Sequence, residues 1–287
     1  MEIEVVTKDK LDIICSVCLD PSVDKETRDL MENGMEERIC WIKDMIPKGL
    51  KIIVASEKPR DEKIHYKWVG KMLHSDLAVH GRVYMGLLEY LPIEHVLEPV
   101  DGENSLFINC MWILPPFWLM GVGKALLESF IESAMQHGGA SVLAYEGDRW
   151  FGTSIKYMPT SFFKKFGFKE VDRDGSRILL YLDLGSSSPP KLIFPKFKEF
   201  HKTEKLKLTI FSNSQCPWSK YMINTIRKEV EKYSNLNLNF HHTDDSELIK
   251  DLGISRGVYL NGNPIIKRMA SWEEIKLEID NYNKKYK

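Results

Sequence analysis

Residues 107–127 read FINCMWILPPFWLMGVGKALL, and this stretch predicts a strand, a glycine-containing turn and the start of a helix. The apolar run before the two prolines fits a buried strand, and apolar residues recur at helical spacing after Gly123. Backbone N–H groups at the start of a helix lack partners within it and carry the positive end of its dipole, so they can bind phosphate. Glycines at 121 and 123 allow a ligand to approach closely. The turn predicts a phosphate site, with a tight packing turn as the alternative.

A second pattern follows at residues 162–171, which read FFKKFGFKEV. Gly167 fits the C-cap of a helix, and Phe168 fits the return of the chain to a sheet. Strand candidates alternate with helical patterns along this half of the chain, which predicts a mixed α/β sheet. The strand candidates lie at residues 2–6, 51–56, 84–93, 106–114, 140–145 and 178–184, and a helix is expected over roughly residues 25–45.

These two patterns together resemble the signatures of the GNAT acetyltransferase family. The turn is similar to the family's acetyl-CoA loop, R/Q-x-x-G-x-G/A, with Gly121 and Gly123 at the glycines and Trp118 at the Arg/Gln position. Residues 162–168 are similar to its late signature, F-Y-x-K-x-G-F. The resemblance covers about residues 1–185. It implies the GNAT acyl-CoA N-acyltransferase fold, acetyl-CoA as co-substrate and transfer of an acetyl group to an amine.

The resemblance also implies which residues hold the co-substrate. The pyrophosphate would meet backbone amides of the turn, and the pantetheine arm would lie along the end of the preceding strand. The expected residues are Leu119, Met120, Gly121, Val122, Gly123 and Lys124 for the turn, and Trp112, Ile113 and Leu114 for the strand end. The indole of Trp118 offers one neutral donor, so we expect it to line the groove or pack beneath the turn rather than to bind phosphate.

The usual catalytic residues of the family are absent from their positions. Phe163 stands where the late signature has its tyrosine acid, and residues 106–114 contain no carboxylate. Tyr157 and Glu89 are candidate substitutes, as are Glu146 and Asp148 after the strand at 140–145 and, further on, Cys216. The alternative is a water chain that needs no single base. Cys110, on the same strand, fits either an acyl-accepting nucleophile or a small buried residue, and burial is favoured.

The sequence GSSSPP at residues 185–190 predicts a boundary, followed by a connector up to residue 205. Residues 206–287 have the predicted order β-α-β-α-β-β-α, which resembles a thioredoxin-like domain. Cys216 begins a predicted helix in the sequence C-P-W-S, which is similar to monothiol glutaredoxin-like proteins. A helix start predicts a thiol that is more acidic and more reactive than the other cysteines. Ser219 replaces a resolving cysteine, so an interaction module stays an equal alternative to a redox site.

The domain order predicted for the chain is a GNAT domain at residues 1–185, a linker at 186–205 and a thioredoxin-like domain at 206–287. This pairing resembles YoaP-type acetyltransferases, a bacterial group. The predicted function is transfer of acetyl from acetyl-CoA to an amine of a small molecule or peptide by direct attack. The alternative is a non-catalytic acyl-CoA-binding or thiol-redox sensor protein that uses Cys216.

Composition narrows the partners of the 287-residue chain. Forty basic residues balance forty-one acidic ones, so we expect no nucleic-acid or membrane surface, and the sequence carries no signal that fixes the oligomeric state. No apolar run reaches the roughly 18–20 residues of a membrane span, and the five cysteines predict reduced thiols in the cytoplasm. Cys15 and Cys18 fall on one helix face, which favours core packing over a metal site, and Cys40 is expected to be buried as well.

Overall fold

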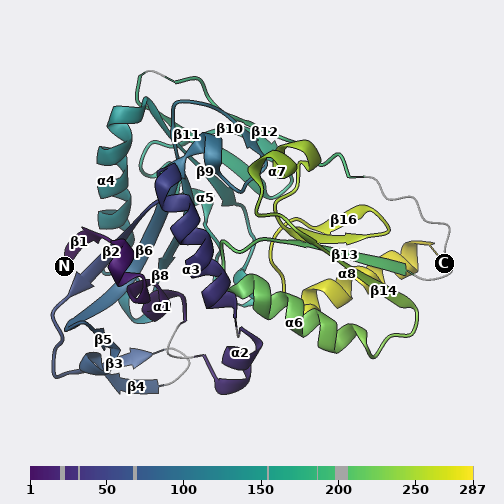
Figure 1. Cartoon of the computed structure of the whole chain (residues 1–287), viewed down its shortest axis with the longest axis horizontal. Coiled ribbons are helices and arrows are strands. Elements are labelled where there is room, and N and C mark those ends of the chain that lie inside the picture. Colours follow the sequence, from purple (N-terminus) through teal and green to yellow (C-terminus); the bar gives the residue numbers. More distant parts are fainter. Residues whose placement is uncertain are drawn as a thin grey trace.

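The computed structural model describes residues 1–287 apart from 20–22, 32, 67–69, 154, 186, 198–205 and 287. It contains an eight-stranded sheet in the N-terminal region, residues 1–185, and a four-stranded sheet in the C-terminal region, residues 206–286 (Figure 1). Within the described part of the chain, no helix has the length and the apolar composition needed to cross a membrane.

The N-terminal sheet has the strand order β1-β2-β6-β8-β9-β11-β10, with β5 beside β6. Its neighbouring strands are antiparallel except for β8 and β9, which helix α4 (Val122–Ala134) connects in parallel. The mixed α/β sheet predicted from the sequence is confirmed. Its strands are β1 (Glu2–Val5), β2 (Lys51–Glu57), β5 (Ala78–Val79), β6 (Arg82–Pro92), β8 (Leu106–Ile113), β9 (Gly139–Tyr145), β10 (Lys169–Asp174) and β11 (Arg177–Asp183). A separate hairpin joins β3 (Lys63–Tyr66) to β4 (Gly70–Leu73).

The pairing of β8 with β9 is short. It runs from Leu106 opposite Ala140 to Ile108 opposite Val142, so the second half of β8 is not paired with β9. On the other edge of β8, the register with β6 shifts between Glu89 and Tyr90, which leaves Asn109 as the extra residue of a bulge. A bulge bends a strand and changes the direction of its side chains. Both features lie at the middle of β8, and they open the sheet along the half of the strand that leads to the glycine turn.

Helices cover both faces of the N-terminal sheet. Helix α4 and the short α5 (Thr160–Lys164) pack on one face, where Leu126, Leu127 and Phe130 are fully buried. Helices α1 (Asp12–Cys18) and α3 (Gly34–Met45) pack on the other, with Ile14 and Ile42 at its core. The apolar residues of each helix therefore recur on the side that packs against the sheet.

The single helix expected over residues 25–45 is wrong. The structure has α2 (Lys25–Leu30), which Asp24 caps through the N–H of Thr27, and a separate α3. Asn33 separates them with φ of +65°, a left-handed conformation that asparagine tolerates better than most residues. The first residue of α3, Gly34, lies against Pro217 of the C-terminal region, where an added Cβ would be 2.8 Å from the Pro217 carbonyl oxygen.

The C-terminal region has the element order predicted from the sequence. Its sheet runs β14-β13-β15-β16, with β13 and β14 parallel and the other pairs antiparallel. The elements are β13 (Leu206–Ser212), α6 (Trp218–Val230), β14 (Leu236–His242), α7 (Ser246–Leu252), β15 (Gly257–Leu260), β16 (Asn263–Ile266) and α8 (Trp272–Tyr286). Its likeness to thioredoxin and the domain limits at 185 and 205 stay predictions.

The predicted linker at 186–205 lies partly outside the described residues, since residues 186 and 198–205 are not among them. Its described part is attached to both regions. The short strand β12 (Lys191–Leu192) pairs with β7 (Val100–Asp101) of the N-terminal region. Further on, the N–H of Lys196 donates to the carbonyl of Leu252 at the end of α7. The connector is therefore a structural element between the two regions.

Gly253 tests this attachment. It ends α7 with φ of +71°, and an added Cβ would lie 2.2 Å from the carbonyl oxygen of Phe194 in the connector. We expect Gly253→Ala to lower the free energy of unfolding by about 2–5 kcal/mol, because backbone strain adds to a steric clash. Gly175→Ala is the matched control, since Gly175 has φ of +65° and no neighbour within 4 Å of an added Cβ. In urea unfolding, the control should lower the free energy of unfolding by only about 1–2 kcal/mol. Equal losses in the two variants would contradict the contact between Gly253 and Phe194.

Candidate functional site

Two adjoining cavities lie where the sheet opens. The strand groove has a volume of about 200 Å³ and is lined by the end of β8 and the start of α4 and α5, including Ile113, Trp118, Gly123 and Phe162. The inner cavity has a volume of about 50 Å³ and lies between the two regions, lined by Arg38, Asn109, Cys110, Trp150, Cys216, Trp218 and Arg256 among others. Met111, Trp112 and Tyr157 line both cavities, so the two are neighbours across these three side chains.

The turn before α4 has the conformation that an anion site requires. Gly121 is the N-cap of α4 with φ of +81°, and no atom lies within 4 Å of where its Cβ would be. Leu119 also has a positive φ, +64°, and its side chain is fully exposed. A turn of this kind leaves the first N–H groups of α4 open to solvent, where the helix dipole favours negative charge. Residues 119–124 therefore fit the diphosphate contact expected from the sequence.

The strand end of the expected site divides into two parts. Trp112 and Ile113 line the strand groove. Leu114 is buried, and its N–H donates to the carbonyl of Met85, so it lies beneath the groove rather than on its wall. The indole of Trp118 lines the groove and donates to the Ile113 carbonyl at 2.8 Å. Its single N–H is therefore used within the protein, in keeping with the expectation that it does not bind phosphate.

Tyr157 is the candidate catalytic residue with the most suitable position. Its ring packs against Trp150 and Tyr145, with centroid distances of 5.0 and 4.9 Å, at the junction of the two cavities. Burial raises the pKa of the Tyr157 phenol well above its usual value. The phenol therefore stays protonated at neutral pH, so this residue can donate a proton but is a poor base.

Glu89 has a different environment. Its side chain is fully buried on β6, where one carboxylate oxygen lies 2.9 Å from Nη2 of Arg38 and the other accepts from Nδ2 of Asn109 at 3.3 Å. It lines neither cavity. Both of its carboxylate oxygens have partners within the protein. Glu89 therefore forms an ion pair with Arg38 and does not face either cavity.

The expectation of an acidic Cys216 thiol is wrong. Burial is the largest influence and raises the pKa of this thiol, although the positive charge of Arg38 and a hydrogen bond from the backbone of Trp218 lower it. Cys18 and Cys110 line the same cavity, and burial raises the pKa of Cys18 to about 12 and that of Cys110 well above its usual value. The start of a helix lowers a thiol pKa only when the thiol is solvated enough for burial not to dominate.

The other cysteines divide as follows. Cys15 and Cys18 are half-buried on α1, and Cys18 packs against the apolar cluster beneath the sheet, as expected. Cys40 is exposed, so its predicted burial is wrong, because it lies on the outer face of α3 while the next residue, Trp41, is buried. Among the described residues, no group of three or more His, Cys, Asp or Glu side chains is arranged to hold a metal ion.

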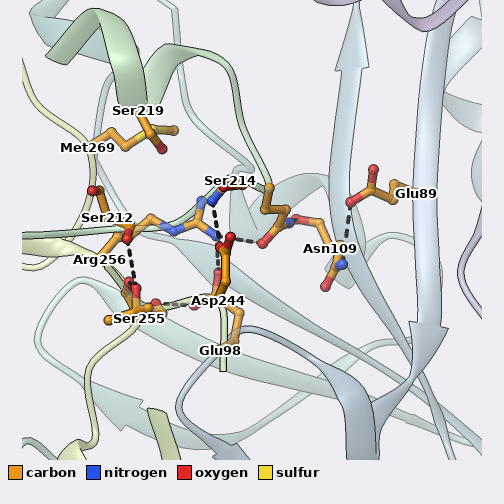
Figure 2. Close-up of polar contacts among 12 residues, drawn as sticks. Glu89, Glu98, Asn109, Ser212, Ser214, Ser219, Asp244, Ser255, Arg256 and Met269 are labelled. Atoms are coloured by element: carbon orange, nitrogen blue, oxygen red, sulfur yellow. Dashed lines mark hydrogen bonds and ion pairs between the residues drawn. The ribbon is translucent and has the colours of Figure 1, made fainter. Parts of the chain in front are cut away.

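Sequence reasoning missed the polar residues that join the two regions. Nη1 of Arg38 donates to the backbone carbonyl of Gln215, and the side-chain amide of Gln215 donates to the carbonyl of Asn109 at 3.1 Å. Nη2 of Arg256 donates to Gln215 Oε1 at 2.7 Å and to Glu98 Oε1 at 2.9 Å. All five side chains are at least nine-tenths buried. Figure 2 shows Arg256, Glu98 and Asn109 of this network. The one available clue was position, since Gln215 directly precedes Cys216.

Comparison with known proteins fits this geometry. Residues 48–157 match the model of the acetyltransferase (GNAT) family. The N-terminal region thus has the GNAT fold, and the match supports an acyltransferase. Over 206 residues, the chain is 25% identical to the uncharacterized N-acetyltransferase YoaP of Bacillus subtilis (strain 168), an alignment that covers 68% of this chain and 79% of that protein.

Two acetyltransferases are among the solved structures that the comparison returned. The PaiA N-acetyltransferase from Thermoplasma acidophilum, in complex with coenzyme A, has 15% identity and a TM-score of 0.39, covering 64% of this chain and 99% of that one. The GNAT protein YhbS from Escherichia coli, in complex with CoA, has 12% identity and a TM-score of 0.37, covering 64% of this chain and 81% of that one.

The cysteine environments give a testable order of reactivity. We expect iodoacetamide at neutral pH to modify Cys40 first and Cys216 at least about tenfold more slowly, because the Cys216 thiolate is disfavoured by burial. Peptide mass spectrometry after timed alkylation measures all five rates. In urea, where the regions are separated and unfolded, the five rates should converge. Faster modification of Cys216 in the folded protein would contradict the closed inner cavity.

Proposed function

We propose that this chain is an acetyl-CoA-dependent N-acetyltransferase whose reaction occurs at the junction of the strand groove and the inner cavity. The observation that carries the proposal is that Met111, Trp112 and Tyr157 line both cavities. A thioester that lies in the groove and an amine that lies in the inner cavity would meet beside these three residues. The family match and the N-acetyltransferase relative support the same reaction.

The chain offers a continuous path for acetyl-CoA. The exposed turn at 119–124 supplies backbone N–H groups for the diphosphate, and the open space at Gly121 admits it. The half of β8 beyond Ile108 is not paired with β9, so its backbone can hold the amide groups of a pantetheine arm. The strand groove then leads to Tyr157.

Tyr157 acts in this proposal as the general acid. The amine nitrogen attacks the thioester carbonyl carbon, the C–S bond breaks, and its electron pair leaves with sulfur. The phenol of Tyr157 donates its proton to that sulfur, and the proton lost by the amine returns to the phenolate, which restores the residue. Proton transfer by a positioned side chain contributes about 10²–10⁴ to a rate. The usual tyrosine position of the family, Phe163, needs no hydroxyl in this arrangement.

A separate base is not required if the amine arrives uncharged. Of the described residues that line the two cavities, none carries a carboxylate or an imidazole, while Arg38 and Arg256 both face the inner cavity. Like charges repel one another, so two guanidinium groups in the wall do not favour a protonated amine there. The neutral amine is the form that attacks a thioester.

The alternative function, a thiol-redox sensor, has less support. A redox cysteine needs a thiolate and access to its partner thiol. Burial raises the pKa of Cys216, which lies in the wall of the cavity between the regions, and Ser219 stands where a resolving cysteine would be. We therefore assign Cys216 to the wall of the inner cavity.

The turn can be tested by calorimetry. We expect Gly121→Val to weaken acetyl-CoA binding by at least about tenfold, because a β-branched residue strains the positive φ and fills the open space over the N–H groups. Gly81→Val is the matched control, since Gly81 also has a positive φ, +72°, and no neighbour within 4 Å of an added Cβ. Unchanged affinity in folded Gly121→Val would refute the site.

The acid can be tested by kinetics. We expect Tyr157→Phe to lower kcat by about 10² or more while the affinity for acetyl-CoA stays the same, because only the proton donor is removed. Tyr233→Phe is the control for loss of a phenol hydroxyl, since Tyr233 packs against Trp272 in the C-terminal region. Acetyl transfer is read as release of the CoA thiol. If the Tyr157→Phe enzyme kept its full kcat, another group would have to donate the proton to the leaving sulfur.

A further inference from the structure

Three buried polar atoms around the inner cavity have no partner within the described part of the chain. They are Nε of Arg38, Nε of Arg256 and Oδ1 of Asn109. Their side chains are 1%, 5% and 7% exposed, and all three residues line the cavity. Buried donors and acceptors in folded proteins almost always find partners, and removing them from water without one is unfavourable. The residues that carry these three atoms meet in the wall of a single cavity, where a bound molecule would supply the missing partners.

The wall of the inner cavity is electropositive. Arg38 and Arg256 line the cavity, whereas the carboxylates paired with them, Glu89 and Glu98, do not. Figure 2 shows Glu98 and Glu89 on opposite sides of the network that passes through Arg256 and Asn109. The start of α6, with Cys216, Pro217 and Trp218, adds the positive end of a helix dipole to the same wall.

The three unpartnered atoms also define a chemical pattern. Two are N–H donors of cations, which suit the two oxygens of one carboxylate. The third is an amide oxygen, which accepts an N–H. Its orientation is fixed because the other end of the Asn109 amide donates to the carboxylate of Glu89. A carboxylate with an amine close to it is the complement of this set.

We propose that the amine acceptor of this enzyme carries a carboxylate, as a free amino acid does. This inference rests on the proposed acetyltransferase function. The carboxylate binds between Nε of Arg38 and Nε of Arg256. The amine donates one N–H to Oδ1 of Asn109 and directs its lone pair to the thioester beside Tyr157. Arg38, Arg256 and Asn109 thereby decide which amines are acetylated.

The size of the cavity limits the acceptor further. A water-sized group needs about 10–15 Å³ of such space, so the volume of about 50 Å³ holds roughly three to five of them. Trp112, Trp150 and Trp218 are also part of the wall, with the ring centroid of Trp150 6.0 Å from that of Trp112 and 5.9 Å from that of Trp218. Small amino acids such as glycine, alanine, serine and β-alanine match these dimensions, and the indoles exclude a second charged group.

The proposal is tested with the full chain, acetyl-CoA and amines in matched pairs. Glycine is compared with methylamine, alanine and β-alanine with ethylamine, and serine with ethanolamine, so that each pair differs by the carboxylate. CoA thiol release gives kcat/KM for each amine. We expect at least one carboxylate-bearing amine to exceed its partner by about tenfold to a hundredfold, the effect of hydrogen bonds to a charged group.

The outcomes separate this proposal from the proposed function. Equal or faster acetylation of the amines without a carboxylate overturns it and leaves the acetyltransferase function intact. A second result also overturns it. The protein binds acetyl-CoA, but the carboxylate-bearing amines are neither acetylated nor able to quench the tryptophan fluorescence of the cavity wall. Failure to bind acetyl-CoA would instead contradict the proposed function itself.

Variants of Arg256 test whether this residue causes the preference for amines that carry a carboxylate. We expect Arg256→Gln to bring the ratio of kcat/KM within each pair close to one. Since removal of one partner leaves Glu98 buried and unpaired, the double variant Arg256→Gln/Glu98→Gln provides a second test without an isolated charge. Arg268→Gln is the control, because Arg268 pairs with Asp148 and Glu274 and does not line the inner cavity. A carboxylate preference that survives in either folded Arg256 variant would overturn the assignment.

Discussion

The buried hydrogen bonds of Gln215 determine the rest of the site. Its backbone carbonyl accepts from Arg38, and its side chain donates to the Asn109 carbonyl and accepts from Arg256. These contacts join two ion pairs, Arg38–Glu89 and Arg256–Glu98, that are almost completely removed from solvent. Buried charges are tolerated only when each is paired and hydrogen-bonded. The two regions must therefore meet in this one register, and the inner cavity exists only when they do.

Strand β8 connects this interface with the proposed co-substrate path. Its first half pairs with β9, its second half leaves β9, and the bulge at Asn109 lies between the two halves. The same bulge presents the Asn109 carbonyl to Gln215 and the Asn109 side chain to Glu89. One local irregularity thus opens the groove that we propose for acetyl-CoA and positions a residue of the cavity wall. A regular strand would place successive side chains on opposite faces and could not do both.

The features that sequence reasoning predicted are the local ones. The strand, the glycine turn and the helix at 107–127 follow from residues next to one another, and the positive φ of Gly121 is what a glycine at that place permits. The element order after residue 206 was predictable for the same reason. Tyr157 was a candidate only by its nearness in sequence, and the structure places it between the two cavities.

The features that it missed depend on contacts between distant segments. The helix dipole at Cys216 was correctly located, but the burial that raises the pKa of the thiol comes from α1, α3 and β8 of the other region. Arg38 looked like an ordinary charged helix residue, and nothing in its own segment indicates that 51 residues later Glu89 would be its partner. Glu89 was chosen for its carboxylate, and its pairing could not be seen without the sheet.

The high pKa values of the three thiols have a consequence for the charge of the cavity. Arg38 by itself would favour the thiolate of Cys18, Cys110 and Cys216, yet burial outweighs this attraction at each of them. A thiolate there would compete with any anionic ligand for the guanidinium groups of Arg38 and Arg256. Neutral thiols leave those two cations without an anion among the described residues that line the cavity, since Glu89 and Glu98 are not among them. Cysteine at these positions therefore acts as a small, polarizable wall that fills space and keeps the positive charge available to the substrate.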